Sequence, residues 1–227
     1  NKLSVKTKFE ALFEKFCDGH NMEWFRVATS DQKGIKTPDY DISVPDGPLV
    51  VVEVKQFDPN PEEKAAILQL RAGRVGDFGG TPGARIRSAI TAAKEQLKAR
   101  SKGKHPALLV VYNNIPECTL HTEPYAILTA MRGLDVISVF VPDDPSIEPI
   151  FSPTTRPGPK KEMTPSANTS ISAIGVLYCV NAGVPAMDVY HNRFAKIALH
   201  HSDLAQVPEI KHLRMRDDQN DWDPLYA

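Results

Sequence analysis

The sequence predicts an α/β fold in which a central mixed sheet is flanked by helices and further strands are added toward the C-terminus. Three observations predict it: an amphipathic helix near the start of the chain, a valine-rich hairpin that follows it, and a helix and apolar strand beyond residue 84. A chain of 227 residues can bury one sizeable core. We therefore expect one domain over residues 1–227, with a core at 5–141, a proline-rich loop or arm at 142–168, and C-terminal strands and a tail at 169–227.

The first elements follow from hydrophobic spacing. Residues 3–18 carry apolar side chains three and four positions apart, which predicts an amphipathic helix, and residues 23–29 predict a strand. Residues 39–44 alternate between polar and apolar, and residues 49–57 are rich in valine. Because the turn-forming sequence Pro45-Asp46-Gly47-Pro48 separates these two segments, they predict a β-hairpin.

The middle of the chain alternates helices with strands. After a glycine-rich connection at 58–84, whose first part also has helical spacing, residues 86–98 predict a helix. The apolar segment 107–112 predicts a buried strand of a parallel or mixed sheet. A helix at 124–131 and a strand at 134–141 complete the predicted core.

The C-terminal part of the chain is less regular. Residues 142–168 are too rich in proline for a regular element, so we expect a loop or an ordered arm. Residues 170–180 and 187–190 predict two strands, which we place as a hairpin at an edge of the sheet. The final segment, 202–227, is expected to lie along the surface as a tail anchored by Trp222.

The composition excludes several classes of protein. With 27 Lys+Arg, 28 Asp+Glu and 41% hydrophobic residues, the chain is an ordinary globular sequence, neither disordered nor collagen-like. No apolar run approaches the ~20 residues of a membrane helix, and no signal peptide is recognisable, so we expect no membrane partner. Three widely spaced cysteines argue against a disulfide framework, so we expect a reducing compartment, the cytoplasm.

The predicted hairpin carries the residues that indicate chemistry. Side chains of a strand alternate between faces, so Asp39 and Asp41 share one face, and Glu53 and Lys55 share one face. If the connecting loop has an odd number of residues, the two sets lie on the same face of the sheet, whereas an even loop would separate them. We expect Asp41 opposite Glu53 and Asp39 opposite Lys55, so that three carboxylates and one ammonium gather together.

Three neighbouring carboxylates repel one another unless a divalent cation joins them, and oxygen ligands suit Mg²⁺ or Mn²⁺. Such an ion can stabilise the charge that develops when a phosphodiester is displaced in line. A lysine two residues after a metal-binding carboxylate is placed to orient the attacking water. This set of residues therefore predicts hydrolysis of phosphodiester bonds.

The hairpin resembles that of the PD-(D/E)XK nuclease superfamily, which has the restriction-endonuclease-like fold. The matching motifs are Pro38-Asp39 and Glu53-Val54-Lys55. The resemblance covers about residues 9–112 and implies an αβββαβ core. It also implies a metal-dependent nuclease, expected to be an endonuclease that acts on DNA with Mg²⁺ or Mn²⁺.

The resemblance implies a role for each matching residue. The metal ligands would be Asp39, Glu53 and the carbonyl of Val54, and the catalytic lysine would be Lys55. Members often add a glutamate from the first helix, and Phe9-Glu10 resembles the Phe-Glu of Mrr-like restriction enzymes. Glu10 lies beside the apolar stripe of its predicted helix and is our choice, with Glu14 as the alternative.

A basic segment follows the hairpin. Between Lys64 and Lys104, basic residues outnumber acidic residues by ten to two, although the whole chain has a net charge of −1. Such residues can contact a phosphate backbone without reading its sequence, although a basic run is often only a solvated surface. The candidates for contacts with nucleic acid are Arg71, Arg74, Arg85, Arg87, Lys94 and Lys98.

Alternatives remain open at this point. Glu53 and Lys55 can instead form a structural ion pair on the solvent face of the hairpin, and the domain can be a non-catalytic module that binds nucleic acid or protein. An RNA-directed nuclease is a further alternative. Cutting both strands of a duplex with one site per chain usually requires two copies, so a second copy of the chain, forming a homodimer, is one expected partner. Cys118 and His121 have metal-like spacing but no second pair of ligands, which does not predict zinc.

Overall fold

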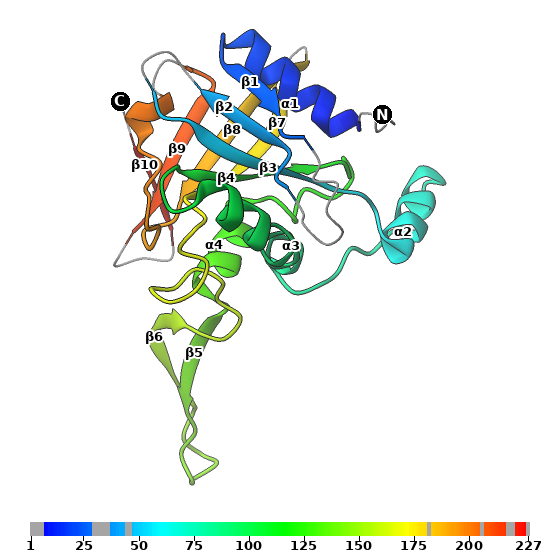
Figure 1. The fold of residues 1–227 in the computed structure, drawn as a ribbon. Coiled ribbons are helices and arrows are strands. Elements are labelled where there is room, and N and C mark those ends of the chain that lie inside the picture. The colour runs from blue at the N-terminus through cyan, green and yellow to red at the C-terminus, as the bar shows by residue number, and fades with distance from the viewer. Residues whose placement is uncertain are drawn as a thin grey trace.

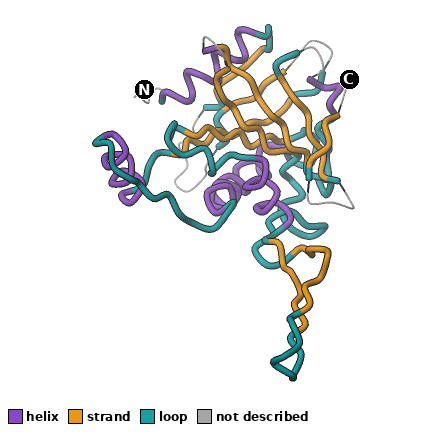
Figure 2. Tube along the Cα trace, turned by 180° about the vertical axis from the view of Figure 1, so that it is seen from behind, coloured by secondary structure: helices purple, strands orange, loops and turns teal. Residues whose placement is uncertain are grey.

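The computed structural model describes residues 7–28, 37–43, 47–180, 183–204, 207–216 and 221–225, apart from the side chains of residues 154 and 155. Its centre is a twisted sheet with α1 on one face and α3 and α4 on the other (Figure 1). A separate two-stranded ribbon, made of β5 and β6, projects away from this body in both views (Figures 1 and 2). The structure is therefore a mixed α/β sheet flanked by helices, as predicted.

The elements have the following bounds. The helices are α1 (Lys8–Gly19), α2 (Pro61–Arg71), α3 (Ala84–Ser101), α4 (Pro124–Arg132) and a short 3-10 helix, His201–Leu204. In spatial order, the strands of the main sheet are β1 (Glu23–Arg26), β2 (Tyr40–Ser43), β3 (Val50–Phe57), β4 (Ala107–Asn113), β7 (Ala173–Val180), β8 (Val184–His191), β9 (Ile210–Met215) and β10 (Trp222–Leu225). The ribbon consists of β5 (Asp135–Phe140) and β6 (Ile150–Pro157).

The main sheet contains both strand orientations. Strands β3, β4 and β7 are parallel neighbours, and β8 is parallel to β9. The pairs β1–β2, β2–β3, β7–β8 and β9–β10 are antiparallel. None of the helices in the described ranges is long and apolar enough to cross a membrane.

The ends of the helices follow from local chemistry. Thr7 caps α1 by accepting a hydrogen bond from the Glu10 amide, while the Glu10 carboxylate accepts one from the Thr7 amide. Asn60 and Glu63 form the same capping box at α2. Gly83 begins α3 with φ of 73°, and a Cβ there would lie 2.6 Å from the Ala126 carbonyl oxygen. Glycine is therefore required where α3 meets α4.

Strand β3 is buried on both faces, which explains its valine-rich sequence. Val50, Val52 and Val54 face the core under α1, while Val51 and Phe57 face the core under α3. Along the α3 face, Glu53 and Lys55 occupy the two positions between those apolar residues. The sheet thus directs one carboxylate and one ammonium toward the helix layer.

The hairpin forms, but its predicted register is wrong by two residues. Tyr40 pairs with Val52, and Asp41 pairs with Val51 rather than with Glu53. The connection still has odd parity, so the two sets of side chains share a face. The register had to come from the length of the loop, which the turn sequence alone does not specify.

Two predictions about the ribbon require correction. The segment 134–141 was expected to belong to the core, but among the described strands β5 pairs with β6 alone, in a separate sheet. The proline-rich segment 142–168 was expected to lack regular structure, yet it contains β6, and its alternative description as an ordered arm is the appropriate one. Strand propensity is local, whereas the choice of a pairing partner is not.

The C-terminal strands also differ from expectation. The predicted hairpin forms as β7 and β8, but β7 pairs with β4 in the interior of the sheet rather than at an edge. The expected tail contributes β9 and β10. Trp222 does anchor this segment, because its ring packs on Tyr190 and its Nε1 donates to the Pro124 carbonyl oxygen at 3.0 Å.

Candidate functional site

Asp39 and Glu53 meet where β2 begins beside β3. The Asp39 Oδ2 accepts a hydrogen bond of 2.9 Å from the amide of Val54. Because Tyr40 pairs with Val52, the next step of the register brings Asp39 alongside Glu53. The two-residue difference from the predicted register therefore brings these two acids together.

Glu53 has two further polar neighbours. Its side chain is 1% exposed, and its Oε1 lies 2.5 Å from the Lys55 Nζ. Gln96 on α3 donates to the Glu53 Oε2 at 3.4 Å and to the Thr37 carbonyl oxygen at 2.8 Å. The ion pair is thus present, but Glu53 is buried under a helix instead of lying on a solvent face.

Burial and mutual repulsion make these carboxylates harder to ionise. Burial raises the pKa of Glu53 to about 7, and the neighbouring Asp39 adds to this effect while Lys55 opposes it. Burial also raises the pKa of Asp39, against the Val54 amide and Lys55, which lower it. Within the described ranges, Lys55 is the one cationic side chain beside these two acids.

Asp41 does not join this pair. It is 6% exposed and forms an ion pair with Arg100 on α3, whose Nε lies 3.3 Å from Asp41 Oδ1. The expectation of three carboxylates in one cluster is therefore wrong, because the register carries Asp41 away from Glu53 and an arginine neutralises it.

The two glutamates of α1 have different surroundings. Glu14 is buried and accepts hydrogen bonds from Arg26 at 2.7 Å and from the Tyr40 hydroxyl at 2.8 Å. Glu10 closes its capping box at 2.6 Å, and its charge contributes to the raised pKa of Asp39, which burial dominates. The Arg26 Nη2 also lies 3.5 Å from the Glu10 Oε1, so both glutamates of α1 contact this arginine, and Glu10 is the one whose charge helps to raise the pKa of Asp39.

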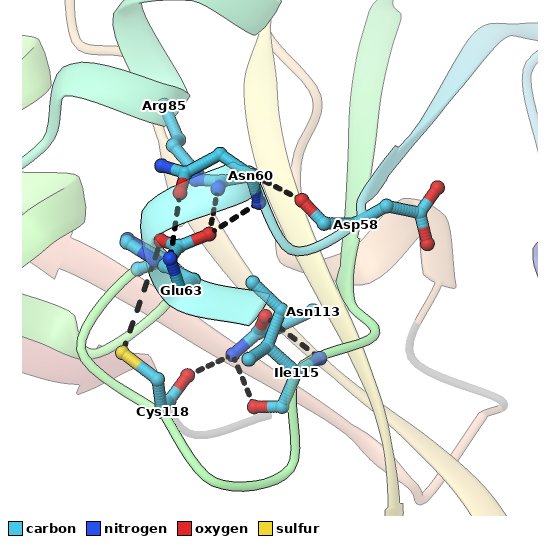
Figure 3. A network of polar contacts seen from close by, with 8 residues as sticks. Asp58, Asn60, Glu63, Arg85, Asn113, Ile115 and Cys118 are labelled. Carbon is cyan, nitrogen blue, oxygen red and sulfur yellow. Dashed lines mark hydrogen bonds and ion pairs between the residues drawn. The ribbon is translucent and has the colours of Figure 1, made fainter. Parts of the chain in front are cut away.

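Two of the predicted nucleic-acid contacts are engaged elsewhere. Arg85 forms an ion pair with Glu63 and donates to the Asp58 carbonyl oxygen at 2.8 Å, in the network drawn in Figure 3. Arg71 lies 2.8 Å from Glu117. Arg74 is exposed. These contacts hold the connection between β3 and α3 in place.

The basic residues of α3 lie on two sides of the helix. Lys94 and Lys98 line a groove of about 720 Å³ together with segment 166–170. At about 100° per residue, Gln96 points away from them, toward Glu53. Arg87 is half-buried, and its Nη1 has no hydrogen-bond partner among the described residues. The helix body therefore separates Lys94 and Lys98 from the paired acids.

Gln96 is the site residue to which the sequence assigned no role. The sequence offered no usable signal for this contact. Gln96 shares a helix face with Arg100, but only the tertiary structure shows that Arg100 reaches Asp41 on β2 and that this face of α3 lies over Glu53.

The pair Cys118 and His121 acquires a third neighbour. The Cys118 Sγ lies 3.8 Å from His121 Nε2, which lies 2.6 Å from Glu63 Oε1. Within the described part of the chain, however, no group of three or more His, Cys, Asp and Glu residues is arranged to hold a metal ion. Neither Cys118 with His121 and Glu63 nor Asp39 with Glu53 forms such a group.

The Asp39–Glu53 pair nevertheless has suitable donors for a hard cation. Mg²⁺ is commonly held by one or two carboxylates, with water and substrate phosphate completing its octahedron. Asp39 and Glu53 provide two adjacent carboxylates whose repulsion a cation would relieve. The residues therefore fit Mg²⁺ or Mn²⁺ with a partly solvent-filled coordination shell.

Comparison of the chain with protein-family models, curated proteins and solved structures finds no significant match.

Proposed function

We propose that the protein is a metal-dependent nuclease that hydrolyses phosphodiester bonds, with Asp39, Glu53 and Lys55 as its catalytic residues. The observation that carries the proposal is the meeting of Asp39 and Glu53 beside Lys55, at the point where β2 begins beside β3. The expected αβββαβ core is part of the same proposal. It is supported by the order of α1, β1–β3, α3 and β4 along the chain, with α2 inserted between β3 and α3.

Each residue has a defined task in this proposal. Asp39, Glu53 and the Val54 carbonyl would hold the cation. Lys55, whose side chain is 32% exposed, orients water and contacts the phosphate. Gln96 and the Val54 amide hold the carboxylates in place. When bound, Mg²⁺ or Mn²⁺ would polarise the phosphate and make the attacking water more acidic.

The substrate is expected to be DNA. The full chain would be incubated with plasmid, single-stranded DNA and RNA, with and without Mg²⁺ or Mn²⁺. The Lys55→Ala variant should cleave at least about 100-fold more slowly than the wild type. The control variant Lys64→Ala, at an exposed position on α2, should keep the wild-type rate. Cleavage of RNA alone would replace DNA by RNA as the substrate. Cleavage that survives both Lys55→Ala and chelation would contradict the assignment.

A second candidate is a non-catalytic module. It is favoured by the Glu53–Lys55 ion pair, which already neutralises one carboxylate. Calorimetric titration with Mn²⁺ separates the two candidates, because the nuclease should bind the ion and Asp39→Asn should abolish binding. Wild-type protein that binds no Mn²⁺ and cleaves no nucleic acid would support the module.

A further inference from the structure

The β5–β6 ribbon is a distinct feature that the proposed site does not use. It projects from the body at the end of α4, and its strands pair only with each other among the described strands (Figure 1). An isolated two-stranded hairpin is at best marginally stable in water. The ribbon therefore needs further contacts to be stable.

Both faces of the ribbon expose large apolar side chains. Val139 pairs with Phe151, and Phe140 pairs with Ile150, so these two pairs point to opposite faces. Phe140 and Phe151 are each 64% exposed. Contiguous exposed apolar surface of this kind marks an interaction site. The exposed large apolar residues of the ribbon and its tip are Ile137, Val139, Phe140, Val141, Ile147, Ile150 and Phe151.

The base of the ribbon is rigidly attached. The Gly158 amide donates to the Leu134 carbonyl oxygen at 2.7 Å, and the Leu134 amide donates to the Pro159 carbonyl oxygen at 3.0 Å. A Cβ on Gly158 would lie 2.4 Å from the Val136 side chain, so these two segments of the chain approach too closely for a residue other than glycine. These contacts fix the place at which the ribbon leaves the body of the protein.

Opposite charges occupy the two ends of the ribbon. Asp143, Asp144 and Glu148 are exposed at the tip. Asp144 forms the turn itself, because it accepts hydrogen bonds from the Ser146 amide at 2.9 Å and from its hydroxyl at 2.7 Å.

The base carries the complementary charge. Arg156, Lys160 and Lys161 are exposed there. The nearby acid Asp135 interacts with the Tyr125 hydroxyl. Each ribbon is therefore acidic at its tip, apolar along its length and basic at its base.

We propose that the ribbon mediates a homodimer in which two copies of the chain pack their ribbons antiparallel about a two-fold axis. This arrangement brings the acidic tip of each ribbon beside the basic base of the other and buries the face of each ribbon that carries Val139 and Phe151. Nucleic acid is a poor occupant, because the acidic tip would repel phosphates.

Charge reversal tests this arrangement in the full chain. Sedimentation velocity should show a dimer for the wild type. Asp143→Lys/Glu148→Lys and Arg156→Glu/Lys161→Glu should each be monomeric, because tip and base then carry like charge. An equimolar mixture of the two variants should form a heterodimer, since both contacts are then complementary. Asp144 is left unchanged because it holds the turn.

The apolar contact is tested separately. Phe151→Asp should raise the dissociation constant of the dimer at least about tenfold, while its far-UV circular dichroism stays that of the wild type. A monomeric wild type, a dimer that persists in Phe151→Asp, or a variant mixture that fails to associate would each overturn the proposal. None of these measurements depends on nuclease activity, so the dimer and the proposed function can fail independently.

Discussion

Glu53 on β3 and Glu63 on α2 are both nearly inaccessible to solvent, at 1% and 5% exposed, but their neighbours differ. Glu63 accepts a hydrogen bond from the Asn60 amide at 2.8 Å, lies 2.6 Å from His121 Nε2, and forms an ion pair with Arg85 (Figure 3). Glu53 has Lys55 and Gln96, and a second acid beside it.

The pKa values of the two carboxyls shift in opposite directions. Burial raises the pKa of Glu63, but the Asn60 amide, His121 and Arg85 outweigh burial and lower it. Burial and Asp39 raise the pKa of Glu53 to about 7. Glu63 has several hydrogen-bond donors for one carboxylate, which makes its cluster structural. Glu53 and Asp39 share one ammonium between two carboxylates, so a cation could still bind there.

The largest expected effect comes from neutralising these two glutamates. Glu63→Gln should lower the free energy of unfolding by about 2 kcal/mol, because it leaves Arg85 and His121 without their anion. Glu53→Gln should change it by less than about 1 kcal/mol, since losing the Lys55 pair is offset by relief of repulsion with Asp39. Urea unfolding measured without divalent ions checks both values.

The exposed Glu62 on the same helix is the matched control, and Glu62→Gln should stay within about 0.5 kcal/mol of the wild type. A larger loss for Glu53→Gln than for Glu63→Gln would reverse the comparison between the two clusters.

A partly buried pair of histidines extends the comparison to groups whose pKa values favour the neutral form at pH 7. The His191 Nε2 lies 2.8 Å from the His212 Nδ1, and burial lowers the pKa of both imidazoles to about 4. The unfolded chain, with histidine pKa values near 6.5, binds more protons between about pH 6.5 and 4, so stability falls as the pH falls through that window.

Between pH 7.5 and pH 5.5, each of these two histidines should lower the free energy of unfolding by an amount on the order of 1 kcal/mol. The pH dependence of urea unfolding should flatten in His191→Gln/His212→Gln, whereas His200→Gln, at an exposed position, should retain the wild-type slope. An unchanged slope in the double variant would show that other groups dominate acid destabilisation.

A smaller effect distinguishes the two aspartates of the hairpin. Asp41→Asn should lower stability by about 1–2 kcal/mol, because it breaks a partly buried ion pair with Arg100. It should leave Mn²⁺ affinity within about threefold of the wild type, while Asp39→Asn abolishes binding. Calorimetric titration of both variants decides this, and equal losses of affinity would return Asp41 to the site.

Local spacing predicted α1, the β2–β3 hairpin, α3 and β4, because each has a clear periodicity and an identifiable turn or cap. It also placed Asp39 and Glu53 on one face of the sheet, since face depends only on whether the loop is odd or even. The predicted partner of Glu53, Asp41, was wrong. The observed register differs by two residues, and a shift of two keeps the same side chains on the same face, so the alternation of the sequence could not distinguish the two registers.

Longer-range choices were less predictable. The segment of β5 has the composition of a core strand, but it pairs with β6 in the ribbon. Segment 210–215 was interpreted as tail, but it joins the sheet because β8 offers an unpaired edge. The ion pairs of Arg85 and Arg100 could not be predicted either, because each arginine reaches an acid far away in the sequence.

The sequence by itself determined which side chains could share a face, since a strand alternates with period two and a helix turns every 3.6 residues. The tertiary structure decided which of those charges meet, because strand register, strand partner and helix placement depend on contacts between distant segments. That choice neutralises Asp41 and Glu63 with arginines and places Asp39 beside Glu53.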